Sequence, residues 1–115
     1  MNIQTLEISS MLLDDETVLS LAELCRYCAL PAEQVMTMIE HGIIEPQNPD
    51  PTAKNWQFAG FSLVRVQTVK RLQSDLGINL EGAALALDLL DEVKALRQQI
   101  KALRRSMQEA EAWHE

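Results

Sequence analysis

Residues 20–46 constrain the fold more than any other part of the chain, because they mark a helix start, a turn and a helix end. Ser20 and Glu23 have the spacing of a capping box, in which each side chain accepts a hydrogen bond from the other residue's backbone N–H. Pro31 suits the first turn of a second helix, and Gly42 falls where a left-handed C-cap would end it. Apolar residues recur at helical spacing on both sides of the turn at Leu21, Leu24, Cys28, Val35, Met36, Met38 and Ile39. The stretch therefore predicts a helix-turn-helix.

The charge of this region argues against the usual use of such a motif, which is DNA binding. Residues 1–60 contain two basic and nine acidic residues, and their net charge of -7 is that of the whole chain. Residues 61–115 contain eight of each and are neutral overall. The second helix, residues 32–41, has no Lys or Arg and carries Glu33 and Glu40. Because duplex binding depends on cations that neutralise phosphates, we expect a basic protein partner rather than nucleic acid.

We predict an acidic docking surface on this region, with an apolar centre at Met36 that supplies most of the affinity. Its candidate residues are Asp14, Asp15, Glu16, Glu23, Glu33, Met36 and Glu40. Each of these carboxylates taken singly is equally consistent with an ordinary solvated side chain. The three consecutive acids at 14–16 are also consistent with a solvated turn.

Neither the cysteines nor the histidines predict a metal, redox or catalytic site. Cys25 and Cys28 have C-x-x-C spacing, but inside a helix rather than ahead of one, which favours buried core thiols. A zinc site would need two further ligands, and His41 and His114 are the only histidines. The chain also lacks a nucleophile set and a phosphate-binding glycine loop. We therefore expect a non-enzymatic protein without cofactors. The absence of a long apolar run and of a signal-like start favours a cytoplasmic location.

The flanking segments predict a tail, a wing and a helix. Residues 1–13 predict a short strand or an adaptable tail, with apolar residues at Ile3, Leu6, Ile8, Met11, Leu12 and Leu13. Residues 47–59 predict a loop leading to a short strand at 56–58. We expect Trp56 and Phe58 to anchor this wing to the core. The alternative is that Trp56 contributes to a partner-binding site. Residues 61–76 predict a helix. We expect Phe61, Val64, Val69 and Leu72 to face the core and Arg65, Lys70 and Arg71 to point outward, as a solvated face.

The last segment carries a heptad pattern. Apolar residues alternate by three and four positions at Ala86, Leu89, Val93, Leu96, Ile100, Leu103, Met107 and Ala110. A helix with this stripe is too long for a small head to cover, so we predict a homodimer through a coiled coil. The predicted interface residues are Leu89, Val93, Leu96, Ile100, Leu103 and Met107. The alternative is a helix that folds back on its own head.

The whole layout resembles the MerR-like superfamily: a helix-turn-helix, the segment 42–46, a wing, two helices and a dimerising helix. The resemblance implies an all-α fold that can include a minor β wing. It also implies a head with supporting helices at residues 1–90 and a coiled-coil helix at 91–115. DNA-binding members usually carry an Arg followed by aromatics about six residues before the Gly, and here Met36, Thr37 and Met38 hold those places.

With its short length and no effector domain, the chain is most similar to the chaperone-modulator branch, the CbpM-type proteins. That resemblance implies a protein that binds and inhibits the J-domain of a DnaJ-like co-chaperone of the CbpA type, and so blocks its action on Hsp70 (DnaK). J-domains present a basic helix, which an acidic head would complement. The alternative that the resemblance leaves open is a MerR-like DNA-binding transcription regulator.

Overall fold

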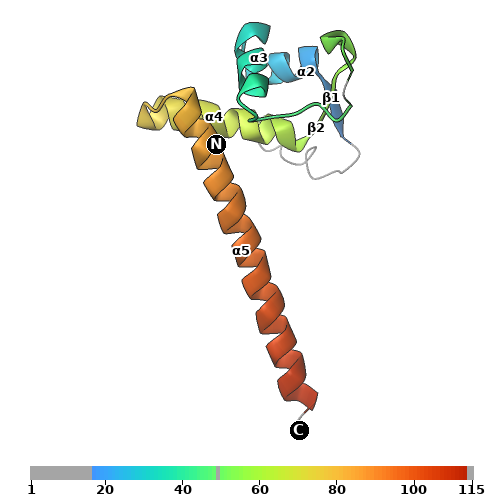
Figure 1. Ribbon diagram of the computed structural model, residues 1–115, viewed down its shortest axis with the longest axis vertical. Helices are drawn as coiled ribbons and strands as arrows, with labels where there is room; N and C mark the ends of the chain where they lie inside the picture. Colours follow the sequence, from blue (N-terminus) through green and yellow to red (C-terminus); the bar gives the residue numbers. More distant parts are fainter. Residues whose placement is uncertain (1–16, 49, 114–115) are drawn as a thin grey trace. The chain divides into compact units, whose positions relative to one another are not determined.

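The computed structural model describes residues 17–48 and 50–113, which form four α-helices and one two-stranded antiparallel sheet (Figure 1). The elements in chain order are β1 (Val18–Ser20), α2 (Leu21–Cys28), α3 (Ala32–Glu40), the 3-10 turn η1 (Ala53–Asn55), β2 (Gln57–Ala59), α4 (Phe61–Leu76) and α5 (Leu80–Trp113). The expected all-α class with a minor β wing is confirmed. No helix of the described residues is long and apolar enough to cross a membrane.

The chain divides into two compact units at residues 84 and 85. We call the described part of the first, residues 17–84, the head, and the part of α5 from Leu85 to Trp113 the distal helix. Helices α2, α3 and α4 surround the core of the head (Figure 1). The largest fully buried side chains of that core are Phe58, Leu24, Ile43, Leu63, Val35, Val66, Val69 and Ser62. The predicted division at residue 90 stays a prediction.

The predicted capping box is confirmed at the start of α2. The Glu23 backbone N–H donates to Ser20 Oγ, and the Ser20 backbone N–H donates to Glu23 Oε1, both at 3.1 Å. The turn after α2 is made by Ala29, which adopts the left-handed conformation with φ of 55°. Pro31 takes the N-cap position of α3, one residue before the first helical turn where we expected it. The boundary differs because the carbonyl of Pro31, rather than of Ala29 or Leu30, accepts the first helical bonds, from Gln34 and Val35.

Gly42 ends α3 as predicted. Its φ of 74° lies in the left-handed region, and a Cβ added at this position would have nothing within 4 Å, so the backbone conformation rather than crowding favours glycine. The Gly42 N–H donates to the Ile39 carbonyl and the Ile43 N–H to the Met38 carbonyl, both at 3.0 Å. These bonds satisfy carbonyls that the last helical turn leaves without a partner. Ile43, directly after this turn, is buried in the core and therefore fixes the position of the chain where it leaves the helix-turn-helix.

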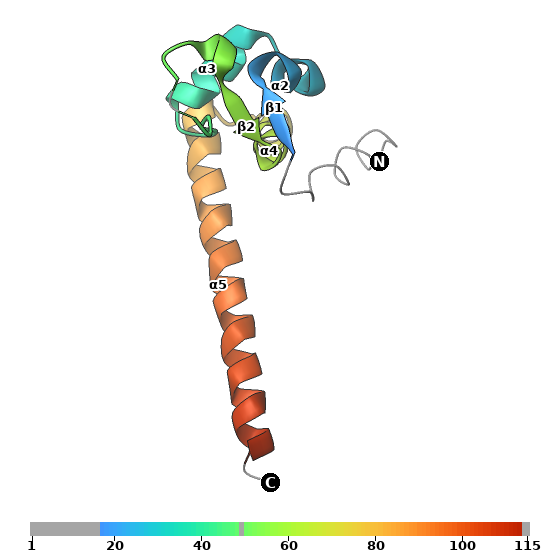
Figure 2. The same cartoon turned by 90° about the vertical axis from the view of Figure 1, so that its right-hand side faces the viewer.

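The wing is a small sheet in which β1 and β2 run antiparallel (Figure 2). In its register, Leu19 lies opposite Phe58. The short strand expected at 56–58 lies one residue later, at 57–59, and Trp56 precedes it. The strand at 18–20 was not expected, because these residues directly precede the capped start of α2. Phe58 is fully buried, and the half-buried ring of Trp56 meets it edge to face at 6.3 Å. Trp56 Nε1 also donates to the Asp50 carbonyl at 2.7 Å. The interpretation that both aromatics pin the wing fits these contacts.

The buried face of α4 differs from the one we predicted. Its buried residues are Ser62, Leu63, Val66 and Val69. Of the four residues expected inside, only Val69 is buried, whereas Phe61 and Val64 are 63% and 45% exposed. The sequence carries two apolar stripes on this helix, and periodicity alone cannot tell which one meets the core. Packing against α2 and the wing selects the stripe through Leu63 and Val66.

Two of the three cations of α4 also do not point outward as expected. Arg65 Nε donates to the Ile43 carbonyl at 2.6 Å, and Lys70 Nζ donates to the Cys28 carbonyl at 2.5 Å. Both side chains are partly buried. Lys70 reaches the last residue of α2, and Arg65 reaches the segment after α3, where carbonyl groups lack helical partners. Only Arg71 is exposed. These two hydrogen bonds therefore connect helix α4 to the helix-turn-helix.

Candidate partner-binding surface

The outer face of α3 brings together three of the predicted docking residues. Glu33, Met36 and Glu40 follow one another at three and four residues, which places them along one side of the helix. The buried residues of α3, Val35 and Met38, lie on the opposite side. The core contacts of the helix therefore turn the predicted surface towards solvent.

The exposure of these residues matches a charged surface with an apolar centre. Glu33 and Glu40 are exposed, and Met36 between them is half-buried. No Lys or Arg occurs on α3, so no cation on this helix neutralises the two carboxylates. An approaching basic group would meet both acids on either side of an apolar contact.

Thr37 belongs to the same face and was not predicted as a site residue, although its position four residues after Glu33 is a signal that could have shown it. Its hydroxyl donates to the Glu33 carbonyl at 3.0 Å, and its own carbonyl accepts from His41 Nδ1 at 2.8 Å. A hollow of about 280 Å³ adjoins Thr37. Its lining residues are Gln34, Thr37, Met38, Gln73 and Leu80. The α3 face, residues 33, 36, 37 and 40, therefore borders a recess with polar walls.

The remaining predicted acids do not join this face. Glu23 lies on α2, and its carboxylate is occupied by the capping box. Hydrogen bonds from the backbone and side chain of Ser20 lower the pKa of Glu23, with a smaller contribution from the charge of Arg26. Asp14, Asp15 and Glu16 lie outside the described residues. Their part in docking stays a prediction.

The two cysteines are free, and the expectation of buried core thiols holds for Cys28 but only in part for Cys25. Cys28 is buried, and this burial raises the pKa of its thiol to about 11. Cys25 is half-buried, and desolvation raises its pKa as well. Both thiols are therefore protonated at neutral pH, which is opposite to what nucleophilic or metal-binding cysteines require. Among the described residues, no group of three or more His, Cys, Asp and Glu is placed to hold a metal.

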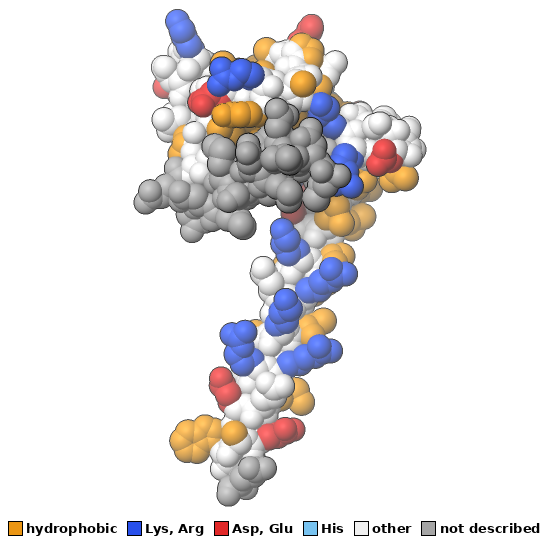
Figure 3. All heavy atoms as spheres, turned by 180° about the vertical axis from the view of Figure 1, so that it is seen from behind, with side chains coloured by type: hydrophobic (Ala, Val, Ile, Leu, Met, Phe, Trp, Pro, Cys, Tyr) orange, Lys and Arg blue, Asp and Glu red, His pale blue; other side chains and the backbone are white. Residues whose placement is uncertain are grey.

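The distal helix exposes all six predicted interface residues. The exposed fractions are 56% for Leu89, 41% for Val93, 49% for Leu96, 48% for Ile100, 64% for Leu103 and 63% for Met107. Figure 3 shows basic side chains along this helix next to apolar ones. A stripe this long and this apolar is typical of a surface that a second helix covers.

Comparison with known proteins agrees with this architecture. The model of the family described as MerR HTH family regulatory protein matches residues 19–105, which include the helix-turn-helix, the wing, α4 and most of α5. The fold and this match define the class of the protein: a MerR-like helix-turn-helix regulator.

Curated relatives narrow the class further. A chaperone modulatory protein CbpM of Coxiella burnetii (strain Dugway 5J108-111) is 35% identical over 98 residues, covering 85% of this chain and 91% of the relative. Proteins of the same name from Pseudomonas entomophila (strain L48) and Pseudomonas putida (strain GB-1) are each 34% identical over 89 residues, covering 77% of this chain and 86% of the relatives. The chain therefore belongs to the CbpM family within the MerR-like class. These names are those of regulatory proteins rather than of an enzyme family.

Proposed function

We propose that this protein is a non-enzymatic chaperone modulator that binds and inhibits the J-domain of a DnaJ-like co-chaperone of the CbpA type. It would thereby block the action of that co-chaperone on Hsp70 (DnaK). The names of its relatives support the modulating role. The observation that carries the docking proposal is the outer face of α3, where Glu33 and Glu40 flank Met36 and no cation lies on the helix.

This surface suits a basic helix for two physical reasons. Uncompensated carboxylates raise the rate of encounter with a cationic partner, because attraction acts before contact is made. Most of the affinity in such interfaces comes from an apolar contact that the charged rim shields from water. The half-buried Met36 supplies that contact here. Glu23, Asp14, Asp15 and Glu16 extend the acidic field in this proposal.

The proposal includes a homodimer formed through the distal helix. Six large apolar residues between Leu89 and Met107 are each more than two-fifths exposed. Pairing with a second copy removes them from water, and knobs-into-holes packing of a and d residues gives the pairing a defined geometry. Each dimer would carry two α3 faces and could hold two J-domains.

The test of the docking face is a charge reversal of Glu33 and Glu40 to Lys. Both residues are exposed, so the fold should remain intact by circular dichroism. The association rate with a purified J-domain, measured by stopped flow at low ionic strength, should fall at least about tenfold and lose most of its salt dependence. The matched control reverses Glu109 and Glu111 on the distal helix, which changes the net charge equally, and should keep the parental rate. Equal rates for both variants would remove the α3 face from the proposal.

The second candidate is a MerR-like DNA-binding regulator, because the matching family is described as one of helix-turn-helix regulatory proteins. It requires a recognition helix that tolerates phosphate, and α3 offers two glutamates and no cation. The chaperone partner is therefore the stronger proposal. A binding assay with duplex DNA distinguishes these two candidate functions, because binding would favour the transcription regulator and no binding would favour the chaperone modulator.

A further inference from the structure

The distal helix carries a stripe of cations beside the heptad seam. Each of its four members follows a seam residue by one position, and all four are exposed. Successive members lie three or four residues apart, so they line one side of the helix. In Figure 3, Lys and Arg side chains follow one another along the distal helix. We call this set the basic stripe: Lys94, Arg97, Lys101 and Arg104.

The basic stripe has no compensating acids within its own length. Residues 93–108 contain five Lys and Arg and no Asp or Glu. The charged neighbours of Lys101 at three and four residues are all cations, namely Arg97, Arg104 and Arg105. Like charges at this spacing destabilise an isolated helix. An anionic partner would replace this repulsion by attraction.

The homodimer doubles this charge in either orientation of its helices. In a parallel pair, each basic stripe lies beside its own copy. In an antiparallel pair that covers the whole seam, Leu89 lies opposite Met107, so the centre falls at residue 98, within both stripes. Four cations from each chain, eight in all, then gather at the middle of the pair. This step rests on the homodimer of the proposed function, which sedimentation tests without any anionic ligand, so the two can fail separately.

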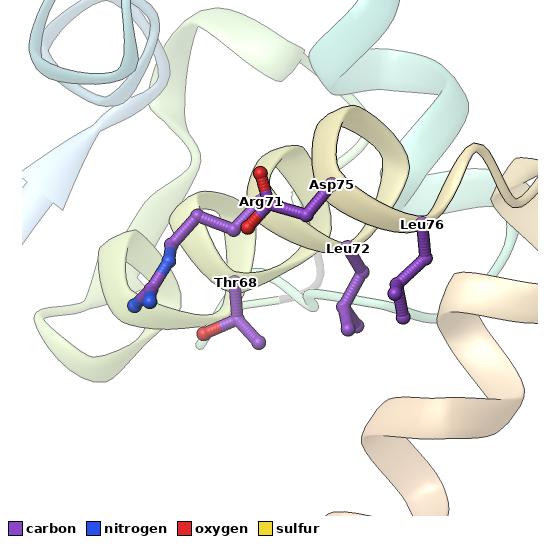
Figure 4. Close-up of a pocket in the computed structure, with 5 residues that line it drawn as sticks. All are labelled: Thr68, Arg71, Leu72, Asp75 and Leu76. Atoms are coloured by element: carbon purple, nitrogen blue, oxygen red, sulfur yellow. The ribbon is translucent and has the colours of Figure 1, made fainter.

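The depression on α4 lacks such uncompensated charge. It measures about 240 Å³ and is lined by Thr68, Arg71, Leu72, Asp75 and Leu76. Thr68, Leu72 and Leu76 point the same way from the helix, with Arg71 and Asp75 at the rim (Figure 4). The two rim residues have opposite charges four residues apart, so the depression selects neither an anionic nor a cationic partner. Exposed Arg71 is therefore a suitable control position for the basic stripe.

The acids on either side of the basic stripe distinguish between two classes of anionic partner. Asp91 and Glu92 precede it, and Glu109 and Glu111 follow it. A nucleic acid carries a phosphate at every nucleotide and continues past both ends of the stripe, where these carboxylates would repel it. A polypeptide can confine its acids to the stretch opposite the cations. The boundaries therefore favour an acidic protein segment over nucleic acid.

We propose that the basic stripe binds an acidic helical segment of a partner protein, whose carboxylates recur at three and four residues. Arg97 and Arg104 lie ~10.5 Å apart along the helix axis, which is also the spacing of carboxylates seven residues apart on an adjacent helix. Guanidinium groups form paired hydrogen bonds with carboxylates. Lys94 and Lys101 occupy b positions of the heptads and the two arginines occupy e positions, so the stripe stays accessible when the seam is paired. This site is separate from the α3 face and needs no J-domain.

Fluorescence anisotropy of two labelled, alanine-based helical peptides tests the proposal on the full chain. The first peptide carries Glu at three- and four-residue spacing along one side, and the second carries the same number of Glu spread around the helix. At low ionic strength we expect the first to bind at least about fivefold more tightly, because only its carboxylates can meet the basic stripe together. Its binding should weaken steeply with added salt. Equal Kd values would indicate charge attraction without a matched site and would overturn the proposal.

A matched pair of charge reversals locates the site. Lys94→Glu with Lys101→Glu should weaken binding of the one-sided peptide at least about tenfold. The dimer should remain by sedimentation, because b positions lie away from the seam. Lys54→Glu with Arg71→Glu reverses two exposed cations of the head, changes the net charge equally and should keep the parental Kd. An equal loss in both variants would remove the basic stripe from the proposal.

Two further measurements identify other occupants of the basic stripe. Tighter binding of a single-stranded oligonucleotide than of the one-sided peptide at the same salt would assign the stripe to nucleic acid. Growth beyond the dimer that Glu33→Lys with Glu40→Lys abolishes would assign it to the acidic head of a second copy. Either result would overturn the proposal, and we expect neither.

Discussion

Replacing Leu96 and Ile100 together by Asp should dissociate the proposed dimer. These residues occupy adjacent d and a positions at the centre of the heptad seam. Their exposed fractions are 49% and 48%, so about half of each side chain remains available for burial by a partner helix.

The size of the effect follows from that exposure. Fully burying a large aliphatic side chain contributes ~2 kcal/mol, so covering the exposed half contributes ~1 kcal/mol. The double substitution acts on both chains and therefore removes ~4 kcal/mol of burial, which corresponds to about a thousandfold weaker dimer. Four carboxylates at the seam add a desolvation cost of several kcal/mol in the same direction.

Sedimentation equilibrium at micromolar concentration measures the outcome. The parent should sediment at twice the 13.0 kDa of one chain, and the double variant at that of one chain. The matched control, Gln98→Asp with Ala102→Asp, adds the same charge on the opposite side of the helix and should remain dimeric. Circular dichroism separates loss of pairing from loss of the head. A double variant that remains dimeric with an intact helix would refute the seam as the interface.

Three further predictions concern nucleic acid, the turn and the α4 cations. Duplex DNA should not be retarded in a mobility assay at low salt, where electrostatic binding is strongest; micromolar binding would favour the transcription regulator. Ala29→Gly should raise the free energy of unfolding by ~0.5–1 kcal/mol in urea titrations, because Ala is strained at φ of 55° and Gly is not; a decrease would contradict the left-handed turn. Lys70→Met should lower the free energy of unfolding by about 1–3 kcal/mol, because the Cys28 carbonyl loses its donor. Arg71→Met on the exposed side is its control.

Local signals predicted the fold where one short stretch contains both partners of an interaction. The capping box needs only Ser20 and Glu23, and the left-handed end of α3 needs only Gly42, so both could be read without tertiary structure. The left-handed turn at Ala29 could not, because no Gly or Asn marks it. The α3 face was predictable in the same local way, since Glu33, Met36 and Glu40 share one side of any helix over this segment.

The amino-acid sequence alone therefore determined α2, α3 and α4, the -7 charge of the first sixty residues and the heptad seam, whereas the helix expected before residue 90 and the helix expected from residue 91 are one continuous helix, α5. The tertiary structure decided which apolar stripe of α4 is buried and what its cations do. Two stripes on one helix have similar hydrophobicity, and the choice depends on the shape of the neighbouring helices, which periodicity does not encode. Arg65 and Lys70 turn inward because carbonyls at residues 43 and 28 lack donors, and those carbonyls come near only after long-range packing.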